Sequence, residues 1–515
     1  MVTMAVTVNK IRPRSAKPEL PRHTPLAGAL SVWITLLASP AAALDWQFTP
    51  TLGAAATLTD NVNQSATDQQ SSLILSVTPG FSLQYEGSRR LQAGMFYSLS
   101  GVTRSGEGQE DSLFSSLNAN GRAELIEDFL FIDASANISQ QLISLLGSPA
   151  DATINDTNRA TTGFYSISPY IKQRFGSFAD AELRYSATGS VFQRDAANDI
   201  YANTLSGTLN SGSNFNNLFW GLDFSMRNAS VQNDQNSKFE HYGANLGYNL
   251  TRHLQAFSTF GYDSNEYTAT PGTETSGSFW TLGMNWAPNR RTDIGASFGE
   301  SYYGRTYSFD LNYRNDHSVW SASYNDGVSD ISQQLLNTQP YYIWNCNGEL
   351  SYTTGALPPQ GKTNCKLQET APIGSVPVGL ANGIYISKTF NAAAYWSKGR
   401  SSLGLSVFNT RRQYQQVVGE PEDSARGVSV NYGYSLQPLT TLDAGFGFTN
   451  TQSPAGLESI LARDDNYYNF NLGVNHQFGS KLTGTLVYRH QWRDSNVPTA
   501  EFTENNITAT ANISF

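Results

Sequence analysis

The two cysteines are the side chains of this 515-residue chain whose type and spacing point most clearly to a chemistry. Cys346 and Cys365 have 18 residues between them and lie in one segment, 326–383, which mostly lacks strand alternation. In an oxidising compartment such a pair forms a disulfide, and closing a loop of this size contributes about 3 kcal/mol. A metal site is disfavoured, because neither cysteine has a histidine or another cysteine at ligand spacing. The pair therefore predicts a stapled loop if the chain is exported.

The histidines and serines do not form a hydrolytic pattern. Beyond the first 43 residues the histidines are His241, His253, His317, His476 and His490. None is followed by a serine two positions later, and no Gly-x-Ser-x-Gly or phosphate-loop motif occurs. The acidic pairs Glu127-Asp128 and Glu422-Asp423 fall in predicted turns or loops, where solvated charge is the ordinary role. We expect no enzymatic activity, no cofactor and no metal.

Small polar and charged side chains recur at every second position and alternate with apolar residues, as on a strand with one polar face and one apolar face. The members of these rows that we predict to face a lumen are Asp133, Asn137, Asp223, Arg227, Asp310, Asn312, Arg314, Asn431 and Asn471. Such groups donate and accept hydrogen bonds, so the face could pass water, ions or hydroxyl-rich solutes such as sugars. Any large water-filled barrel has a polar interior, however. The rows therefore indicate a pore and give only a hint of carbohydrate.

The elements that must carry these rows are alternating segments of about ten residues, the length of a tilted membrane-crossing strand. Clear examples are 220–226, 280–286 and 468–474, each with an apolar residue at every second position. Beyond the first 43 residues there is no run of about 20 apolar residues, which excludes a helical membrane protein. The segments favour an all-β fold.

The connections between these segments alternate in length. Short turns are predicted near Gly87-Ser88, Glu127-Asp128, Gly176-Ser177, Gly212-Ser213, Arg252-His253, Pro288-Asn289, Asn315-Asp316, Lys398-Gly399, Gln437-Pro438 and Gly479-Ser480. Longer polar connections are predicted at Asp60–Gln70, Gln141–Thr161, Asn265–Gly277 and Arg411–Asp423. Short turns on one side and long loops on the other are typical of membrane barrels, not of a soluble sandwich. We predict a transmembrane antiparallel up-and-down β-barrel of about 22 strands, within a range of 18–24.

Both ends of the chain fit this fold. Residues 1–43 have a basic start, an apolar stretch at Leu26–Leu37 and small residues at Ala41–Ala43, so we expect a signal peptide before a barrel at 44–515. An uncleaved anchor helix is the weaker alternative. The last strand, 507–515, alternates and ends in an aromatic residue, so Ile513 and Phe515 resemble the terminal signal that the barrel assembly machinery recognises. We expect the outer membrane of a Gram-negative bacterium, with its lipid as the surrounding partner.

Charge argues against nucleic acid as a partner. The full chain has 33 basic and 42 acidic residues, of which the predicted leader contains five basic residues and Glu19. The remaining 28 basic and 41 acidic residues give a net charge of −13. Such a chain does not attract phosphate backbones or an anionic membrane surface.

A barrel of this size encloses a lumen too wide to be filled by its own strand side chains. The first strand begins within a few residues of the predicted cleavage site, which leaves no room for an amino-terminal plug and disfavours a plugged, energy-coupled transporter. The long loop at about 326–383 is the candidate for narrowing the lumen. The alternative is a protruding loop that its disulfide stiffens against proteolysis.

The sequence LDWQFTPTL at 44–52, followed by Leu58-Thr-Asp-Asn-Val62, resembles the outer-membrane proteins associated with the PEP-CTERM/exosortase system. The resemblance implies a barrel of about this length and a context of exopolysaccharide production and export, with polysaccharide as a candidate partner. It implies no mechanism and no functional residue. We therefore predict a passive channel with a polar lumen. The alternative is a non-conducting scaffold or adhesin that binds surface polysaccharide through its outer loops.

Overall fold

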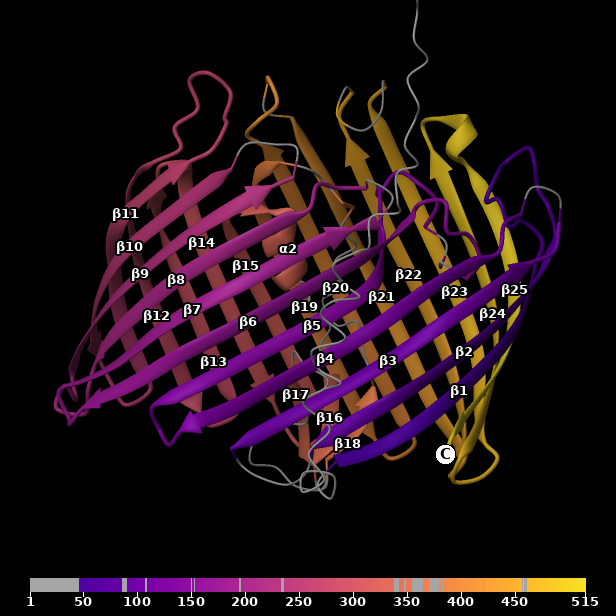
Figure 1. Cartoon of the computed structure of the whole chain (residues 1–515), viewed down its shortest axis with the longest axis horizontal. Coiled ribbons are helices and arrows are strands. Elements are labelled where there is room, and N and C mark those ends of the chain that lie inside the picture. The colour runs from indigo at the N-terminus through magenta and orange to yellow at the C-terminus, as the bar shows by residue number, and fades with distance from the viewer. Residues whose placement is uncertain are drawn as a thin grey trace, which may run out of the picture. The chain divides into compact units, whose positions relative to one another are not determined.

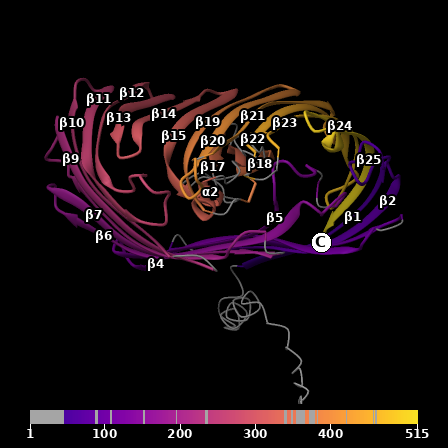
Figure 2. The same ribbon diagram turned by 90° about the horizontal axis from the view of Figure 1, so that it is seen from above.

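Twenty-two strands pair antiparallel with their neighbours and form the wall of a closed β-barrel (Figures 1 and 2). The computed structural model describes residues 46–85, 90–106, 109–149, 151, 153–193, 196–232, 236–337, 342–346, 349–353, 365–369, 379–380, 383–419, 421–455, 457 and 461–515. The predicted signal peptide lies outside these residues. The fold class and the strand number predicted from the sequence are confirmed.

The first fifteen wall strands follow one another directly in the chain. They are β1 (Trp46–Thr59), β2 (Ser72–Tyr85), β3 (Leu91–Arg104), β4 (Ser112–Ile126), β5 (Leu130–Leu142), β6 (Arg159–Phe175), β7 (Ala179–Phe192), β8 (Ile200–Ser211), β9 (Leu218–Val231), β10 (Ser237–Asn249), β11 (Leu254–Glu266), β12 (Gly277–Asn289), β13 (Thr292–Ser301), β14 (Gly304–Arg314) and β15 (Ser318–Asp330). The wall continues with β19 (Ile384–Lys398), β20 (Ser401–Tyr414), β21 (Glu422–Gln437), β22 (Thr440–Ser453), β23 (Arg463–Gln477), β24 (Leu482–Ser495) and β25 (Phe502–Ser514), the last preceded by the short 3-10 helix η2 (Pro498–Ala500).

Period-two alternation sets which side of each strand faces outward. Leu222, Leu246, Phe260 and Leu282, on β9 to β12, are 45–54% exposed and lie on the outer face. A closed barrel with an apolar outside satisfies all of its backbone hydrogen bonds within the sheet, which a strand in lipid requires. The chain is therefore an outer-membrane-type β-barrel. Among the described residues, no helix is long and apolar enough to cross a membrane.

The barrel closes where β1 pairs with β25, with Thr51 opposite Ser514 and Thr59 opposite Asn506. On the inner side of this seam the Glu504 carboxylate is fully buried and accepts hydrogen bonds from Thr59 Oγ1 at 2.7 Å and Gln491 Nε2 at 2.6 Å. Gln64 Nε2 also donates to this carboxylate, at 2.7 Å. Charge-assisted bonds of this kind are among the stronger ones in proteins, so they reinforce the closure.

The C-terminal residues lie on the same seam. Ile513 is opposite Leu52 in β1, and the Phe515 backbone N–H donates to the Pro50 carbonyl at 3.0 Å. The Phe515 side chain is 60% exposed. Its recognition by the assembly machinery stays a prediction.

Short turns occupy one rim of the barrel and most long loops the other, as expected. Two of the tight turns contain Gly176 and Gly399 at φ angles of 60° and 62°, a left-handed conformation that glycine adopts without strain. The turn expected at Pro288-Asn289 lies slightly later, because β12 continues to Asn289 past a bulge. The turn expected at Gly87-Ser88 lies outside the described residues.

Three of the four long loops are shorter than predicted, because the strands extend into them, whereas the loop predicted at Asp60–Gln70 has about the expected length. The prediction of a loop over Arg411–Asp423 is wrong at both ends: β20 continues to Tyr414 and β21 begins at Glu422. One connection on the loop rim, between β13 and β14, consists of Tyr302 and Tyr303 alone. Continued pairing gives backbone groups ladder partners that a loop does not provide, which explains the longer strands.

The long connection between β15 and β19, residues 331–383, is called the inner segment below. It contains the helix α2 (Ile331–Asn337) and three short strands, β16 (Tyr342–Cys346), β17 (Glu349–Thr353) and β18 (Cys365–Glu369), which form a small sheet with β16 in the middle. The sequence did not predict these elements. Figure 2 shows α2, β17 and β18 within the ring of wall strands, and Figure 1 shows them within its height.

The backbone register of the small sheet places Cys346 directly opposite Cys365. Residues that face each other in an antiparallel pair have Cα atoms about 4.5–5.5 Å apart, within the range that a disulfide spans. The two side chains lie outside the described part of the chain, so the disulfide stays a prediction.

Candidate functional site

The predicted lumen residues all lie on the inward-facing positions of their strands. Asp133 and Asn137 belong to β5, Asp223 and Arg227 to β9, Asp310, Asn312 and Arg314 to β14, Asn431 to β21, and Asn471 to β23. The outward positions between them hold exposed apolar residues such as Leu222 and Leu472, which are 50% and 42% exposed. These residues therefore share the inner face of the wall. Some of them pair with charges on the wall, and Arg227 holds the inner segment.

A network of charges lines the inner face of β4 to β7. The Asp133 carboxylate accepts hydrogen bonds from Arg122 Nε at 2.7 Å and from Arg184 Nη1 at 3.0 Å. Arg184 Nε also donates to Glu182 at 3.0 Å, and Lys172 lies 3.6 Å from Glu182. Within this network three cations therefore face two carboxylates.

The inner face of β9 to β12 carries a cluster in which carboxylates predominate. The imidazole of His241 lies between two carboxylates, with Nδ1 2.7 Å from Asp263 and Nε2 3.1 Å from Asp223. The imidazole also stacks on Phe279, with ring centroids 5.0 Å apart. Within the described residues, no group of three or more His, Cys, Asp or Glu side chains is arranged to hold a metal ion. His241 thus bridges two carboxylates from neighbouring strands.

The first end of the inner segment is tied to a separate part of the wall. Arg227 Nη1 of β9 lies 2.7 Å from Asp330, the last residue of β15, and both side chains are less than 10% exposed. The other Asp330 oxygen accepts from the backbone N–H of Gln333 at 3.0 Å, as a capping aspartate does at a helix start. In α2 itself, Ser332 accepts a hydrogen bond from Ser190 of β7 at 2.9 Å. Five strands lie between β9 and β15 along the wall, so this anchor crosses the interior.

The second end of the inner segment is held by Arg412 of β20. Its guanidinium makes a bidentate pair with Asp423, at 3.0 Å and 2.5 Å, and its third donor bonds to the Gly379 carbonyl at 3.0 Å. The side chains of Arg412 and Asp423 are only 3% and 8% exposed. Asp423 was expected to be a solvated loop charge, and that expectation is wrong because β21 begins before it. The Leu380 backbone N–H donates to the Leu142 carbonyl at 3.0 Å, which fixes this end to β5 as well.

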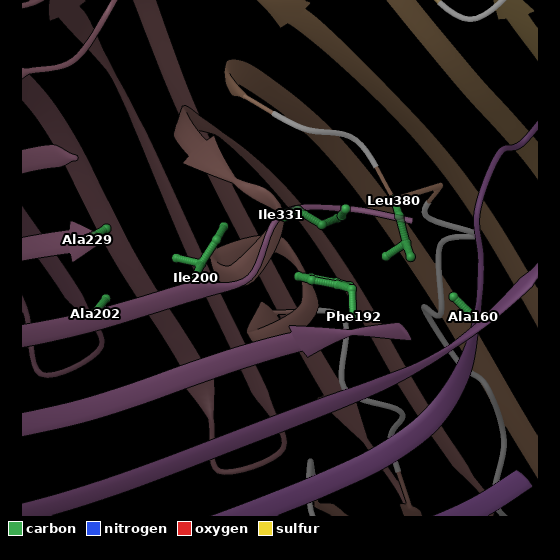
Figure 3. Packing of buried hydrophobic residues seen from close by; sticks show 8 residues of the cluster. Ala160, Phe192, Ile200, Ala202, Ala229, Ile331 and Leu380 are labelled. Atoms are coloured by element: carbon green, nitrogen blue, oxygen red, sulfur yellow. The ribbon is translucent and has the colours of Figure 1, made fainter. Parts of the chain in front are cut away.

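An apolar cluster joins the two ends of the inner segment to the wall (Figure 3). Ile331 and Leu380 come from the inner segment and are 1% and 6% exposed. The remaining buried members are Ala160, Phe192, Ala197, Ile200, Ala202 and Ala229, from β6 to β9 and the loop between β7 and β8. Phe408 of β20 packs against the cluster from the other part of the wall. Burial of this apolar surface adds a non-directional attraction to the polar anchors.

The loop between β5 and β6, residues 143–158, also folds inward at the loop rim. Arg493 of β24 donates through Nη1 to the Gly147 carbonyl at 2.6 Å. Arg104 of β3 donates through Nε to the Ile154 carbonyl at 3.0 Å. These arginines satisfy loop carbonyls that would otherwise be buried without partners. The loop is therefore fixed to β3 on its own side of the seam and to β24 on the far side.

Two tyrosines form the short connection between β13 and β14 on the same rim. Tyr303 Oη donates to Asp326 at 3.4 Å, and Asn265 Nδ2 donates to Tyr302 Oη at 3.1 Å. Burial disfavours the phenolate and raises the pKa of Tyr303 to about 12. Burial likewise raises the pKa of Tyr302. Both side chains are therefore neutral hydrogen-bonding groups at physiological pH.

Several residues of this site were not predicted from the sequence, namely Asp330, Gly379, Leu380, Arg412 and Asp423. A usable signal did exist for one of them. Arg412 continues the inward positions of β20 that contain Ser406 and Phe408, so extending the alternation would have placed it inside. No local signal marks Gly379 or Leu380, because their partners belong to strands distant in the sequence.

No protein-family model matches the sequence, and a search of curated proteins gives no match. Solved structures that are similar include the FrpB iron transporter of Neisseria meningitidis, with 10% identity, a TM-score of 0.46, and coverage of 92% of this chain and 82% of that chain. The siderophore receptor PirA of Acinetobacter baumannii has 9% identity, a TM-score of 0.46, and coverage of 91% and 80%. A loop-deleted OmpT of Vibrio cholerae has 10% identity, a TM-score of 0.31, and coverage of 92% and 100%. At these values the likenesses do not indicate a function for this chain.

Proposed function

We propose that the protein is a passive outer-membrane channel of a Gram-negative bacterium that serves the export of an exopolysaccharide, and that its inner segment narrows the lumen. The observation that carries this proposal is the anchoring of the inner segment at both ends within the wall. Arg227 holds Asp330 at the first end, and Arg412 holds Gly379 at the second. A segment fixed in this way reduces the cross-section available to a solute. Pore size and the polarity of the lining then set selectivity.

The lining supports a polar solute rather than an apolar one. Amide and hydroxyl groups such as Asn431, Asn471 and Ser406 recur around the inner wall, and they both donate and accept hydrogen bonds. A polysaccharide presents hydroxyl groups of the same kind. The resemblance of residues 44–62 to the PEP-CTERM/exosortase-associated outer-membrane proteins supplies the cellular context.

A second candidate function is a sealed scaffold or adhesin that binds surface polysaccharide through its outer loops. The inward fold of loop 143–158 favours it, because Arg104 and Arg493 hold that loop across the rim from two different strands. The loop between β11 and β12 also reaches the loop between β20 and β21, where the Thr270 N–H donates to the Gln415 carbonyl at 2.9 Å. Loops joined in this way form a continuous outer surface.

Conductance of the purified protein in planar lipid bilayers separates the two functions. Stable single-channel steps are expected of the channel, and their complete absence would exclude it. Removing residues 340–370 should increase the single-channel conductance, because most of the chain between the two anchored ends is then missing from the lumen. The matched control is Arg291→Ala, which breaks an exposed ion pair with Asp316 on the turn rim and should leave conductance unchanged. An unaltered step size in the deletion variant would refute constriction by the inner segment.

The cellular half of the proposal needs a separate test. Deleting the gene should lower the amount of polysaccharide at the cell surface and raise the amount retained in the periplasm. Complementation with the intact gene should restore both. Normal surface polysaccharide in the deletion strain would refute a role in export, whatever the bilayer recordings give.

A further inference from the structure

Four phenylalanines occupy inward positions on β9 to β12. Phe239 packs beside Arg227 and Tyr267, whereas the other three lie where the face is otherwise polar or glycine. Phe219 belongs to β9, Phe257 to β11 and Phe279 to β12, and all three are half-buried. We call the following residues the glycine–aromatic patch. They are Phe219, Asp223, His241, Asn245, Gly247, Phe257, Thr259, Gly261, Asp263, Phe279, Thr281 and Gly283.

Each of the three rings covers a glycine of the neighbouring strand. A Cβ atom added to Gly247 would lie 2.1 Å from Cζ of Phe219, and one added to Gly283 would lie 2.3 Å from Cζ of Phe257. A Cβ on Gly261 would lie 2.5 Å from Cζ of Phe279. No other residue type leaves room for a ring in these places. The rings therefore form part of the wall surface instead of projecting into the lumen.

The strand register arranges the patch in rows across the wall. Phe219, Gly247, Phe257 and Gly283 are successive partners in one row, whereas Phe279 lies in the row that contains Gly261. Four residues along the strand separate these two rows, which is about 13 Å. Asn245, Thr259 and Thr281 form the row between them. The result is a shallow strip with aromatic surface at two heights and hydrogen-bonding groups in between.

The upper end of the strip combines an aromatic surface with charge. His241 stacks on Phe279 with an angle of 15° between the ring planes, and its two nitrogens face Asp263 and Asp223. The side chains of His241 and Asp223 are 42% and 33% exposed, so a solute in the lumen can reach them. Each carboxylate keeps lone pairs that His241 does not use.

We propose that the glycine–aromatic patch is a binding subsite for the pyranose rings of an uncharged polysaccharide. One side of a pyranose ring presents C–H groups with small positive partial charges, which meet the negative face of an aromatic ring. Its hydroxyl groups project sideways. There the amide and hydroxyl groups of the middle row can donate and accept hydrogen bonds, and the carboxylates of the upper row can accept them. Glycines keep the strip free of projecting side chains, so a chain can lie along it.

The charge of the patch selects against acidic sugars. Asp223 and Asp263 outnumber the single imidazole between them, and the remaining nearby cation, Arg227, is already paired with Asp330. Like charges in close contact disfavour binding, so a polyuronate should bind more weakly than a neutral polymer. This inference deepens the proposed function by naming the class of polysaccharide, and it rests on that proposal for its biological meaning.

Titration calorimetry on the full chain in detergent tests the subsite without requiring conductance. The probes are cellohexaose and maltohexaose, which are neutral, and a hexaguluronate, which is acidic. At least one neutral probe should bind, and the acidic one should bind at least tenfold more weakly. The triple variant Phe219→Leu, Phe257→Leu and Phe279→Leu keeps apolar bulk but removes the aromatic faces, and should weaken binding at least tenfold. The control Phe260→Leu changes the lipid-facing side of the same strand as Phe257 and should leave binding unchanged.

Hydroxyl-radical footprinting of the unmodified protein keeps the inference testable if the triple variant does not fold. The bound neutral probe should protect Phe257 and Phe279 and should not protect Phe260. No binding of either neutral probe, or equal protection of Phe257 and Phe260, would overturn the subsite. So would a triple variant that folds and binds like the unmodified protein, because the rings would then serve only to cover glycines. A barrel that binds the probe but shows no conductance would refute the proposed channel and leave the subsite standing.

Discussion

Replacing Arg412 separates the stability of the wall from the anchoring of the inner segment. The variant Arg412→Met leaves the Asp423 carboxylate buried without its cation, which costs about 3–5 kcal/mol for a buried pair. It also removes the donor to the Gly379 carbonyl, a charge-assisted bond that contributes about 1.5–3 kcal/mol. Since about 1.4 kcal/mol is a factor of ten, the detached population of this end should rise about 10- to 100-fold.

The double variant Arg412→Met with Asp423→Leu distinguishes the two effects. Replacing a buried ion pair by apolar residues of similar volume is often neutral, so most of the stability of the wall should return. The Gly379 carbonyl still has no donor, so the inner segment should stay loosened. Stability is measured from the temperature at which the folded gel band disappears, and anchoring from single-channel recordings.

The expected pattern is a low melting temperature with enlarged, noisy conductance in the single variant. The double variant should show a recovered melting temperature with the same enlarged, noisy conductance. If conductance returns to the unmodified value together with stability, the bond to Gly379 does not hold the inner segment. The role assigned to Arg412 in anchoring would then be wrong, although its role in the wall would remain.

Three further predictions concern the inner segment, the seam and the loop rim. Cys346 and Cys365 should resist maleimide labelling until a reductant is added, and labelling without reduction would contradict the predicted disulfide. Glu504→Gln should destabilise the barrel by about 1–3 kcal/mol, because one of the groups that donate to the carboxylate then faces an NH₂ group, which is itself a donor. The control is Glu127→Gln at an exposed position. Equal melting temperatures of the two variants would count against the seam network. Because the pKa of Tyr303 is raised from 10.0 to about 12, its contribution to stability is fully present below pH 10 and is lost as the pH rises towards 12. The difference in ultraviolet absorbance between the unmodified protein and Tyr303→Phe should show this ionisation near pH 12, and a midpoint near 10 would contradict the burial.

The wall of the barrel could be predicted because its determinants are local. Alternation with period two decides which residues face lipid, and turn residues such as Gly176 and Gly399 mark where a strand reverses. The closing pair follows from the same rule, since Leu52 and Ile513 are both outward residues of the first and last strands. Each of these features is contained within about ten residues, so a single sequence suffices to read it.

The sequence marked the long loop at 326–383 as a candidate for narrowing the lumen, but its anchors could not be predicted because they join residues distant in the sequence. Arg227 and Asp330 belong to strands six apart in the wall, and no window of the sequence contains both. Asp423 illustrates a related difficulty. Composition near the end of a strand resembles that of a loop, so its charge looked solvated, whereas continued pairing of β20 with β21 placed it beside Arg412.

The glycine–aromatic patch shows what register adds to alternation. Phe257 lies at an inward position, yet its own strand holds outward Phe260 and Tyr262, so an aromatic residue in the sequence does not reveal its side by type. Only the pairing of β11 with β12 places Gly283 opposite Phe257 and gives the ring room against the wall. A shift of one residue in that pairing would turn the rings of the patch towards lipid and expose Phe260 to the lumen. The chemistry of the lumen is therefore determined by which residues face each other across strands. Polar composition alone does not distinguish the proposed sugar-binding strip from a polar wall that only contacts water.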